Sequence, residues 1–313
     1  MEEGNVREET PENTISTKMD EENAAGQSSN DAGAAACSSA SVENTEKPAE
    51  QDDHKLSFVT WNVDGLDGAQ QPRRAVALCK YLIKHSPDVV FLQELIPPYA
   101  LFVNKCLSAD YTIIEGAKEG YFTMILLKKA RITVQKSGVV EYPATRMSRN
   151  LLVARVLFKG RKFCLMTSHF ESGKYGAAER KRQLRLVMRR ISKAREDVTV
   201  LFGGDTNLRD AEVAEVGLPS GVCDVWEQLG EPEHCRYTWD TEVNTNRVMQ
   251  VPNRFRFDRV YLRPATADGV PQLEPDSMAL LGLEKLKCGR FISDHWGIYC
   301  TFSADWTCRE NTN

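Results

Sequence analysis

Short apolar runs rich in β-branched and aromatic residues recur along the chain from residue 56, and this feature most constrains the fold. The runs are residues 56–61, 89–93, 111–115, 122–128, 151–158, 162–169, 198–203, 257–262 and 296–302. Each is bounded by turn-forming or charged residues, which is typical of β-strands. No Pro/Gly/Ser-rich linker interrupts the succession. We therefore predict one domain over residues 55–303, large enough to bury a substantial core.

Two helices are predicted between these strands. Residues 73–85 follow Pro72, which suits the first turn of a helix. In residues 177–195, apolar side chains recur at the spacing of one buried stripe: Leu184, Val187, Met188 and Ile191. The other face is basic, and it carries Arg180, Lys181, Arg182, Arg185, Arg189 and Arg190. A solvated face is the simplest interpretation, although residues 180–182 are also a weak nuclear localisation signal. More strands than helices predicts an α/β fold with two packed sheets flanked by helices.

Charge is distributed unevenly along the chain. Residues 1–54 contain 14 acidic and 3 basic residues, a net charge of −11, whereas the other 259 residues have a net charge of +7. The first segment has almost no large apolar residues, so it cannot bury enough surface to offset its ordering entropy. We predict a disordered acidic arm over residues 1–54 and a short tail over residues 304–313. The basic body is expected to attract anionic partners in a salt-dependent manner.

Several classes of protein are excluded by the sequence. No stretch approaches the ~18 apolar residues that span a bilayer. The acidic, polar N-terminus is unlike a secretory signal or a transit peptide. The nine cysteines are scattered, with no CxxC pair and no histidine at zinc-site spacing. We therefore expect reduced thiols in a nuclear or cytosolic protein and no association with membranes.

Polar side chains gather where five of the apolar runs end or begin. The clusters are TWNVDG at 60–65, FLQE at 91–94, LMTSH at 165–169, LFGGDTN at 201–207 and ISDHW at 292–296. Strand residues at i and i+2 share a face, so Asn62 with Asp64, and Asp205 with Asn207, are expected to point the same way. One such cluster is usually a turn, but five in one domain indicate a site. Carboxylates without cysteine suit a hard cation such as Mg²⁺ or Mn²⁺, which could bridge to an anionic phosphate substrate.

In type and order, the five clusters resemble the endonuclease/exonuclease/phosphatase superfamily, and most closely its 5′-tyrosyl-DNA phosphodiesterase branch. The resemblance covers about residues 55–303. It rests on TWNVDGLD (60–67), SPDVVFLQE (86–94), GYFTMILLKK (120–129), TSHFES (167–172), AAER (177–180), GDTNLRD (204–210), YTWDT (237–241), RFDR (256–259) and LLGLEKLKCGRFISDHW (280–296). It implies a four-layer α/β sandwich, with two mostly antiparallel β-sheets flanked by helices.

The implied activity is hydrolysis of 5′-phosphotyrosyl–DNA bonds, dependent on Mg²⁺ with Mn²⁺ as a substitute. The products would be 5′-phosphate ends, in the repair of double-strand breaks linked to topoisomerase II. The implied partners are DNA 5′ ends, single-stranded or with overhangs, that bear a tyrosine or a topoisomerase II peptide. The implied location is the nucleus, with the cytoplasm as an additional location. Relatives carry a ubiquitin-binding helical domain ahead of the catalytic one, but residues 1–54 show no helical period, so ubiquitin binding is not expected. We expect a monomer.

The resemblance also implies roles for single residues. Asp205 would orient or deprotonate the attacking water, and Asn207 would hold that water or a phosphate oxygen. Glu94 is the first choice of metal ligand. Asp64 and Asp294 are the candidates for further metal contacts, direct or through water.

Other positions match those that grip the substrate. Asn62, His169 and His295 would donate to the phosphate, and Asp258 would orient His295 and favour its charged form. The substrate-binding candidates are Arg209, Trp239, Phe257, Tyr121, Arg149 and Ser172. Of these, Arg209 could pair with a DNA phosphate, and Trp239 and Phe257 could contact the terminal nucleotide. The phenol of the leaving tyrosine has a pKa of about 10, so it needs less protonation than an alkoxide.

Three alternatives accompany the main hypothesis. An abasic-site endonuclease shares the chemistry, but such enzymes usually carry Asn where Asp64 stands. A lipid-directed phosphatase or sphingomyelinase is disfavoured because RFRFDR at 254–259 lacks the Trp-Cys of the phosphatases' WCDR-type segment, and no amphipathic membrane helix is evident. A non-enzymatic binding module would tolerate the loss of a catalytic group, whereas every expected polar position is filled.

Overall fold

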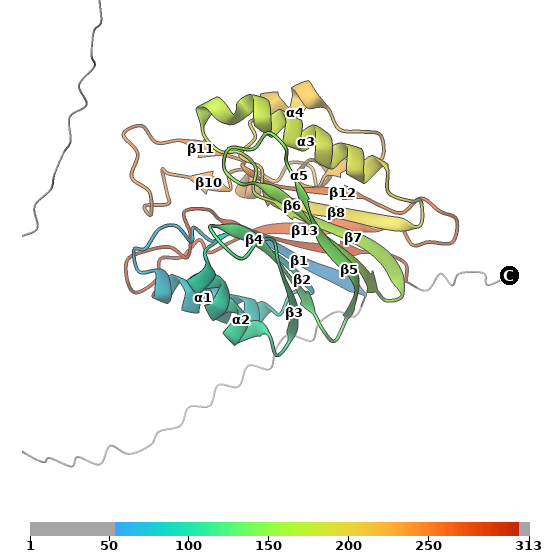
Figure 1. The fold of residues 1–313 in the computed structure, drawn as a ribbon, viewed down its shortest axis with the longest axis horizontal. Coiled ribbons are helices and arrows are strands. Elements are labelled where there is room, and N and C mark those ends of the chain that lie inside the picture. Colours follow the sequence, from blue (N-terminus) through green and yellow to red (C-terminus); the bar gives the residue numbers. More distant parts are fainter. Residues whose placement is uncertain (1–53, 307–313) are drawn as a thin grey trace, which may run out of the picture. The chain divides into compact units, whose positions relative to one another are not determined.

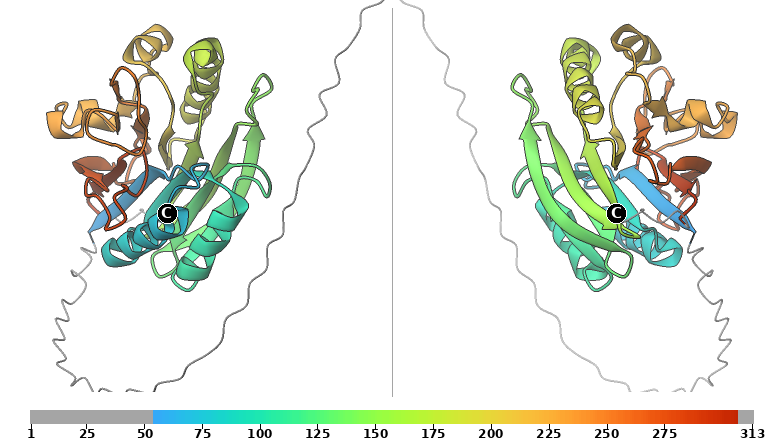
Figure 2. Two further views of the ribbon diagram at one scale, coloured as in Figure 1. Left: turned by 90° about the vertical axis from the view of Figure 1, so that its left-hand side faces the viewer. Right: turned by 90° about the vertical axis from the view of Figure 1, so that its right-hand side faces the viewer.

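Two six-stranded β-sheets pack face to face, and helices cover the outer face of each (Figure 1). The computed structural model describes residues 54–306. The sequence-based predictions for residues 1–53 and 307–313 lie outside this range. The two side views in Figure 2 show the helices on opposite outer faces of the paired sheets. The predicted four-layer α/β sandwich is confirmed.

The first sheet, called sheet A, has the strand order β13-β14-β1-β2-β4-β3. Its strands are β1 (Lys55–Asn62), β2 (Val89–Leu95), β3 (Tyr111–Glu115), β4 (Phe122–Lys128), β13 (Glu274–Leu281) and β14 (Gly297–Ser303). Only β1 and β2 pair in parallel, and all other neighbours are antiparallel. The helices α1 (Gln71–His85) and α2 (Pro97–Leu107) accompany this sheet, and Pro72 lies in the first turn of α1 as predicted.

The second sheet, called sheet B, has the order β5-β6-β7-β8-β12-β9. Its strands are β5 (Ile132–Glu141), β6 (Asn150–Phe158), β7 (Arg161–Ser168), β8 (Val198–Asp205), β9 (Cys223–Asp224) and β12 (Asp258–Arg263). Here only β7 and β8 are parallel, and α3 (Ala177–Ser192) connects them. The remaining elements are short: η1 (Lys174–Gly176), α4 (Asp210–Val216), α5 (Val225–Gln228), η2 (Glu233–Cys235), β10 (Trp239–Asp240) and β11 (Arg254–Phe255).

Apolar side chains fill three layers, one between the sheets and one beneath each set of helices. In the central layer the rings of Phe58 and Phe91 meet edge to face, with their centroids 4.9 Å apart. A Cβ atom added to Gly203 would lie 2.6 Å from the Phe58 ring, so only glycine permits this approach between β8 and β1. The sheets are therefore in close contact next to the end of β8, where the polar cluster begins.

The structure differs from the sequence-based expectation in a few elements. The nine predicted strands are present within a few residues of their predicted ends. The longer elements β5, β13 and α2 were not predicted, nor were the short ones β9, β10, β11, α4 and α5. The helix predicted over residues 177–195 ends at Ser192. The expected solvated face of α3 is wrong at Arg180, which is buried and pairs with Glu212. Glu212 lies on α4, so this part of the basic face docks α4 onto α3.

Two further sequence-based expectations concern membranes and thiols. Within residues 54–306, every helix is too short or too polar to cross a membrane. Seven cysteines of the same range are free thiols.

Candidate active site

The candidate site lies where the carboxyl ends of the two parallel strand pairs meet. A helical crossover joins the strands of each pair, so both strands run toward the same edge of their sheet. Asn62 and Glu94 lie at the ends of β1 and β2, and His169 and Asp205 lie at the ends of β7 and β8. Hydrogen bonds between the two pairs show that these edges coincide.

The side-chain amide of Asn62 joins the two sheets. Its Nδ2 atom donates to Asp205 Oδ2 at 2.9 Å and to Glu94 Oε2 at 3.2 Å. Asn62 and Asp205 are buried, so the hydrogen bond between them is shielded from water. The residue predicted to activate water and the residue predicted to bind metal are thus held by one donor group.

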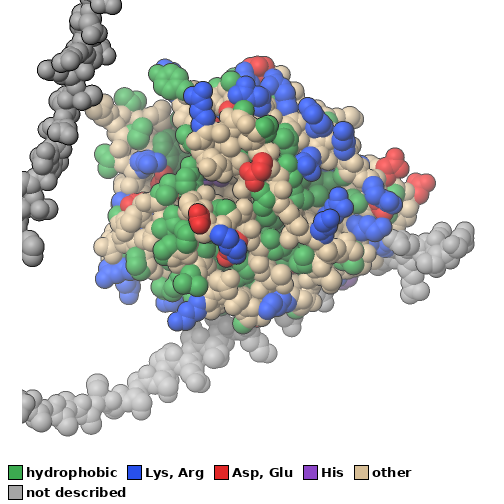
Figure 3. Space-filling view, in the orientation of Figure 1, with side chains coloured by type: hydrophobic (Ala, Val, Ile, Leu, Met, Phe, Trp, Pro, Cys, Tyr) green, Lys and Arg blue, Asp and Glu red, His purple; other side chains and the backbone are tan. Residues whose placement is uncertain are grey.

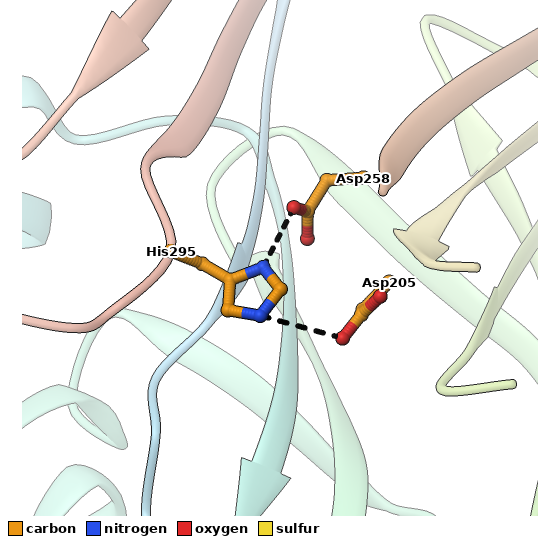
Figure 4. A group of neighbouring side chains, drawn as sticks. All are labelled: Asp205, Asp258 and His295. Carbon is orange, nitrogen blue, oxygen red and sulfur yellow. Dashed lines mark hydrogen bonds and ion pairs between the residues drawn. The ribbon is translucent and has the colours of Figure 1, made fainter. Parts of the chain in front are cut away.

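His295 lies between two aspartates, as Figure 4 shows. Its Nδ1 atom lies 2.8 Å from Asp258 Oδ2, and its Nε2 atom lies 3.7 Å from Asp205 Oδ2. Burial alone lowers the pKa of His295, but the charges of Asp258 and Asp205 outweigh burial and raise that pKa well above its usual value. The imidazole is therefore a charged donor at neutral pH, with Asp258 as the predicted partner at Nδ1.

Asp205 receives hydrogen bonds from several directions. Burial raises the pKa of its carboxyl group, but His169, His295 and the Asn62 amide outweigh burial and hold it well below its usual value. The backbone N–H of Asn207 also donates to Asp205 Oδ1 at 3.0 Å. Asp205 is therefore an anion with a fixed orientation at neutral pH.

A buried arginine determines the tautomer of His169. Arg149 donates to His169 Nδ1 at 2.8 Å, and a guanidinium group cannot accept a hydrogen bond. The His169 proton must therefore lie on Nε2, which is 3.2 Å from Asp205 Oδ2. The Arg149 guanidinium lies over the Tyr121 ring, 4.6 Å from its centroid. Its buried Nε atom has no partner among residues 54–306, so one donor remains free in the site.

Three carboxylates beside this network form the candidate metal site. Burial, then the charge of Asp294, and to a smaller extent that of Glu94, raise the pKa of Asp64 to about 7, and Arg74 opposes this rise. Carboxylates that destabilise each other's charge in this way favour a bound cation. Because the donors are oxygens without a thiol, Asp64, Glu94 and Asp294 fit a hard divalent ion.

A second group could hold a metal ion on distance alone. Ligand atoms of Asp205, Asp258 and His295 all lie within 4.8 Å of one another. These groups already engage one another, because His295 Nδ1 bonds to Asp258 and its Nε2 atom lies 3.7 Å from Asp205 Oδ2. We therefore describe this group as a hydrogen-bonded network, and Asp64, Glu94 and Asp294 remain the predicted metal ligands.

The backbone turns sharply at three of the predicted residues. Asp64, Glu94 and Asn207 have φ angles of 49°, 62° and 52°, a region that non-glycine residues rarely adopt. At Glu94, a register shift between Leu92 and Leu95 marks a bulge in β2. Strained backbone and bulges concentrate at functional sites, where they aim side chains.

The two residues of each predicted i, i+2 pair are related by a turn and not by a strand. Asp64 and Asn207 lie beyond the ends of their strands, so the expectation of a shared strand face is wrong for both pairs. Instead the Asp64 N–H donates to Asn62 Oδ1 at 2.9 Å, just as Asn207 N–H does to Asp205. Each first side chain therefore holds the turn that positions the second residue.

Arg74 is a site residue that the sequence analysis missed. Its side chain is fully buried, and it donates to the backbone carbonyls of Val63, Asp64, Asp67, Ala69 and Ile292. It thereby connects the loop that carries Asp64 to the segment just before Asp294. Only its place on the predicted helix was visible in the sequence, and nothing there distinguished it from a solvated arginine.

Aromatic rings line one side of the site. Trp239 and Phe257 are 9% and 7% exposed, and Trp239 Nε1 donates to Asp294 Oδ2 at 3.2 Å. Phe255, which was not predicted, stacks on Phe257 with a centroid separation of 4.8 Å and is more exposed. Its alternation with Phe257 in RFRF was the available signal. Arg209 lies over both phenylalanine rings. Trp239 and Phe257 are thus mainly packed, and Phe255 offers the more accessible surface.

The predicted residues are not all equally close to this network. Ser172 Oγ donates to the sulfur of Met147 at 3.2 Å, and none of its hydrogen bonds joins the Asp205 network within residues 54–306. Asn207 Nδ2 donates to the Phe170 carbonyl at 3.4 Å, so its amide is held beside β7. The geometry therefore brings together the catalytic and metal candidates and leaves Ser172 at the periphery.

Comparisons with known proteins agree with this architecture. The profile of the endonuclease/exonuclease/phosphatase family matches residues 59–295. Tyrosyl-DNA phosphodiesterase 2 of Danio rerio is 55% identical over 263 residues, covering 84% of this chain and 70% of the relative. The Homo sapiens protein of that name is 48% identical over 260 residues, covering 83% and 71%.

A solved structure extends the likeness to three dimensions. The crystal structure of Danio rerio TDP2 complexed with single-strand DNA product has a TM-score of 0.77 and 56% sequence identity. The match covers 80% of this chain and 99% of that one. The chain therefore belongs to the endonuclease/exonuclease/phosphatase family of hydrolases and, within it, to the tyrosyl-DNA phosphodiesterase 2 proteins.

Proposed function

We propose that this protein hydrolyses 5′-phosphotyrosyl–DNA bonds and leaves 5′-phosphate ends, in the repair of DNA breaks linked to topoisomerase II. The observation that carries the proposal is the joined pair of polar networks at one edge of the sandwich. There Asn62 connects a carboxylate cluster to the chain of Asp205, His295 and Asp258. Relatives named tyrosyl-DNA phosphodiesterase 2 are 55% and 48% identical to this chain over the aligned residues.

The carboxylate cluster is the proposed Mg²⁺ site, with Mn²⁺ as a substitute. Glu94 would hold the ion directly, and Asp64 and Asp294 would complete its surroundings directly or through water. When bound, the ion would neutralise charge on the phosphate and stabilise the transition state. The Arg74 guanidinium and the Trp239 indole hold Asp64 and Asp294 in place for this role.

Asp205 is the proposed partner of the attacking water. Because its pKa lies well below the usual value, Asp205 is a weak base, and its main contribution is to orient the water. Phosphoryl transfer passes through a loose transition state in most analyses, so positioning and charge stabilisation dominate catalysis. Asn207, held next to Asp205 by its own backbone, would keep the water or a phosphate oxygen in line.

The two histidines are proposed to donate to non-bridging phosphate oxygens. His295 carries a positive charge, and its Nε2 atom is only loosely engaged at 3.7 Å from Asp205. His169 presents its Nε2 proton because Arg149 occupies Nδ1. Preorganised donors of this kind stabilise charge that develops in the transition state.

Arg149 and Tyr121 are proposed to face the leaving tyrosine. The buried guanidinium of Arg149 has a free Nε donor beside His169 and would stabilise negative charge on the departing phenol oxygen. Phe255 and Arg209 lie beside Phe257 and Trp239, where they would contact the terminal nucleotide and its phosphate. We propose a monomer that is located in the nucleus, with an additional cytoplasmic pool.

A substrate panel tests this function. Wild-type protein with Mg²⁺ is incubated with 5′-phosphotyrosyl single-stranded DNA, an abasic duplex and a soluble phosphoinositide, with and without chelator. We expect chelator-sensitive release of tyrosine from the first substrate alone. Cleavage of the abasic duplex or of the lipid headgroup instead would retain the fold and the metal site and overturn the proposed substrate.

A further inference from the structure

A basic groove lies on the outer face of sheet B, beside α3 and away from the candidate active site. It has a volume of about 700 Å³, and its lining contains no acidic side chain. Its floor is partly exposed and apolar, with Val153, Cys164 and Leu186. Six basic side chains surround the floor: Arg155, Lys162, Arg189, Arg190, Lys193 and Arg195. In Figure 3, blue side chains follow α3 and lie beside green surface on the same face.

Most of this positive charge is not neutralised. Lys162 and Arg195 share Asp197. Arg155, Arg189, Arg190 and Lys193 have no carboxylate within ion-pair distance among the described residues, although each is exposed. The first half of α3 is different, because Arg180, Lys181 and Arg182 pair with glutamates. Along α3, the unpaired charge is therefore concentrated at the end that lines the groove.

The guanidinium groups converge over the floor. Burial raises the pKa of the Cys164 thiol, and the charges of Arg155 and Arg190 oppose this rise. One of these arginines lies on β6 and the other on α3, so the charge reaches the floor from both sides. A cleft of one charge with low-dielectric walls focuses its field outward and concentrates counter-ions.

We propose that this groove binds the phosphodiester backbone of the DNA whose 5′ end occupies the active site. This inference rests on the proposed function, because it assigns the groove to the same substrate. Arginine predominates among the unpaired cations, and its planar fork matches phosphate oxygens. The floor has no exposed aromatic ring for base stacking, so the contact is to the backbone and independent of sequence.

The geometry sets the length of DNA that can reach the groove. Cys164 on the floor lies five residues before His169, and β7 is extended up to Ser168. At ~3.3 Å per residue this separation is ~17 Å, and a duplex rises ~3.4 Å per base pair, so about 5 base pairs span it. Shorter DNA can fill the active site but cannot contact the groove.

The test combines a double charge reversal with DNA of two lengths. Arg189→Glu with Lys193→Glu changes two exposed groove residues one helical turn apart. Lys80→Glu with Lys84→Glu is the matched control, because it makes the same charge change at the same spacing on α1 of the other sheet. Equilibrium binding is measured with 5′-phosphate DNA of about 4 nucleotides and with an overhang duplex of about 20 base pairs, across a salt titration.

We expect the groove variant to bind the long DNA about fivefold or more weakly, with a salt slope smaller by about 2, because two phosphate contacts are lost. Binding of the short DNA should change less than about twofold, and the α1 variant should resemble wild type. The proposal would be overturned if the groove variant bound both DNA lengths equally more weakly, or if it bound the long DNA as tightly as wild type. It would also be overturned if the α1 control variant bound the long DNA as weakly as the groove variant. Selective binding of an acidic peptide, with long-DNA binding unaffected, would also overturn it.

Tyrosine release from a 5′-phosphotyrosyl DNA of the same short length is measured in parallel. It depends on the active site alone, so its absence would refute the proposed function. The comparison of long and short DNA binding would still decide the role of the groove.

Discussion

Asp205 receives donors from both sheets, and its low pKa gives it a role in orienting water more than in accepting a proton. The change Asp205→Asn removes the negative charge that orders the water and keeps the side-chain size. We expect turnover of 5′-phosphotyrosyl DNA to fall by about three orders of magnitude, with DNA affinity largely unchanged. Single-turnover rates and equilibrium binding of the same variant measure the two effects. Near-normal turnover would remove Asp205 from this role.

Glu94 is the carboxylate that a bulge in β2 aims at the Asn62 amide. Glu94→Gln keeps that hydrogen-bonding position and removes a charge from the metal site. We expect the Mg²⁺ concentration for half-maximal activity to rise by about tenfold or more. A metal titration of activity measures the shift, with isothermal binding of Mn²⁺ as an independent readout. An unchanged titration would move the first ligand to Asp64 or Asp294.

Asp258 raises the pKa of His295 mainly through its negative charge and further through a direct hydrogen bond. Asp258→Asn removes that charge, so the imidazolium loses its proton at lower pH. Because the charged form is the proposed donor, the alkaline limb of the kcat profile should move to lower pH by about one unit. A uniform loss of kcat at every pH, without this movement, would indicate that Asp258 only supports the fold.

At this scale the sequence predicted which polar residues gather, because strand-end clusters of Asp, Asn, Glu and His are visible without a structure. It could not predict Arg74, whose importance comes from backbone carbonyls contributed by two segments that lie far apart in the sequence. It also could not rank Phe255 above Phe257 as an accessible surface, because exposure depends on how β10 and β11 pair. Contacts of this kind are set by tertiary packing.

Among the elements, the central strands and the edge strand β3 were predictable, whereas the edge strands β5 and β13 were not. β5 has mainly exposed side chains and β13 alternates weakly, because each lies at an edge of its sheet. Backbone hydrogen bonds to one neighbouring strand keep such strands in the sheet. Because these bonds do not depend on side chains, the sequence shows no regular hydrophobic pattern there. α2 has an apolar composition without a clear polar stripe and begins with two prolines, so periodicity did not indicate a helix.

The end of β8 offers a test of how closely β7 and β8 must approach. A Cβ atom at Gly204 would lie 2.2 Å from the Ser168 carbonyl oxygen of β7, so Gly204→Ala must separate the strands. We expect the free energy of unfolding to fall by about 2 to 3 kcal/mol, with a loss of activity because Asp205 follows directly. Chemical denaturation measures the change.

The matched control for this prediction is Gly138→Ala in β5 of the same sheet. A Cβ atom there would have open space within 4 Å. Its stability should stay within about 0.5 kcal/mol of wild type. Equal stability of the Gly204 and Gly138 variants would show that the strands relax without cost.

For the whole molecule, the sandwich followed from counting strands and helices, and the family resemblance supplied its four layers. Charge is the other whole-molecule property that the sequence contained. Deleting residues 1–53 removes 14 acidic side chains, which otherwise repel DNA electrostatically over a Debye length. We expect DNA binding at low salt to tighten by several-fold, and the difference to shrink at about 0.15 M salt. Fluorescence anisotropy at several salt concentrations measures it, and identical affinities at low salt would contradict it.

The Asn62 amide spans the boundary between the sheets, with one acceptor in each. Its two hydrogen bonds tolerate only a few tenths of an ångström of change, whereas the apolar layer around Phe58 and Phe91 can slide further before it comes apart. In such an arrangement, catalytic activity depends directly on the alignment of the two sheets. Heat or hydrostatic pressure should abolish activity while the secondary structure is still intact. The two sheets can shift against each other by a fraction of a bond length before either sheet unfolds.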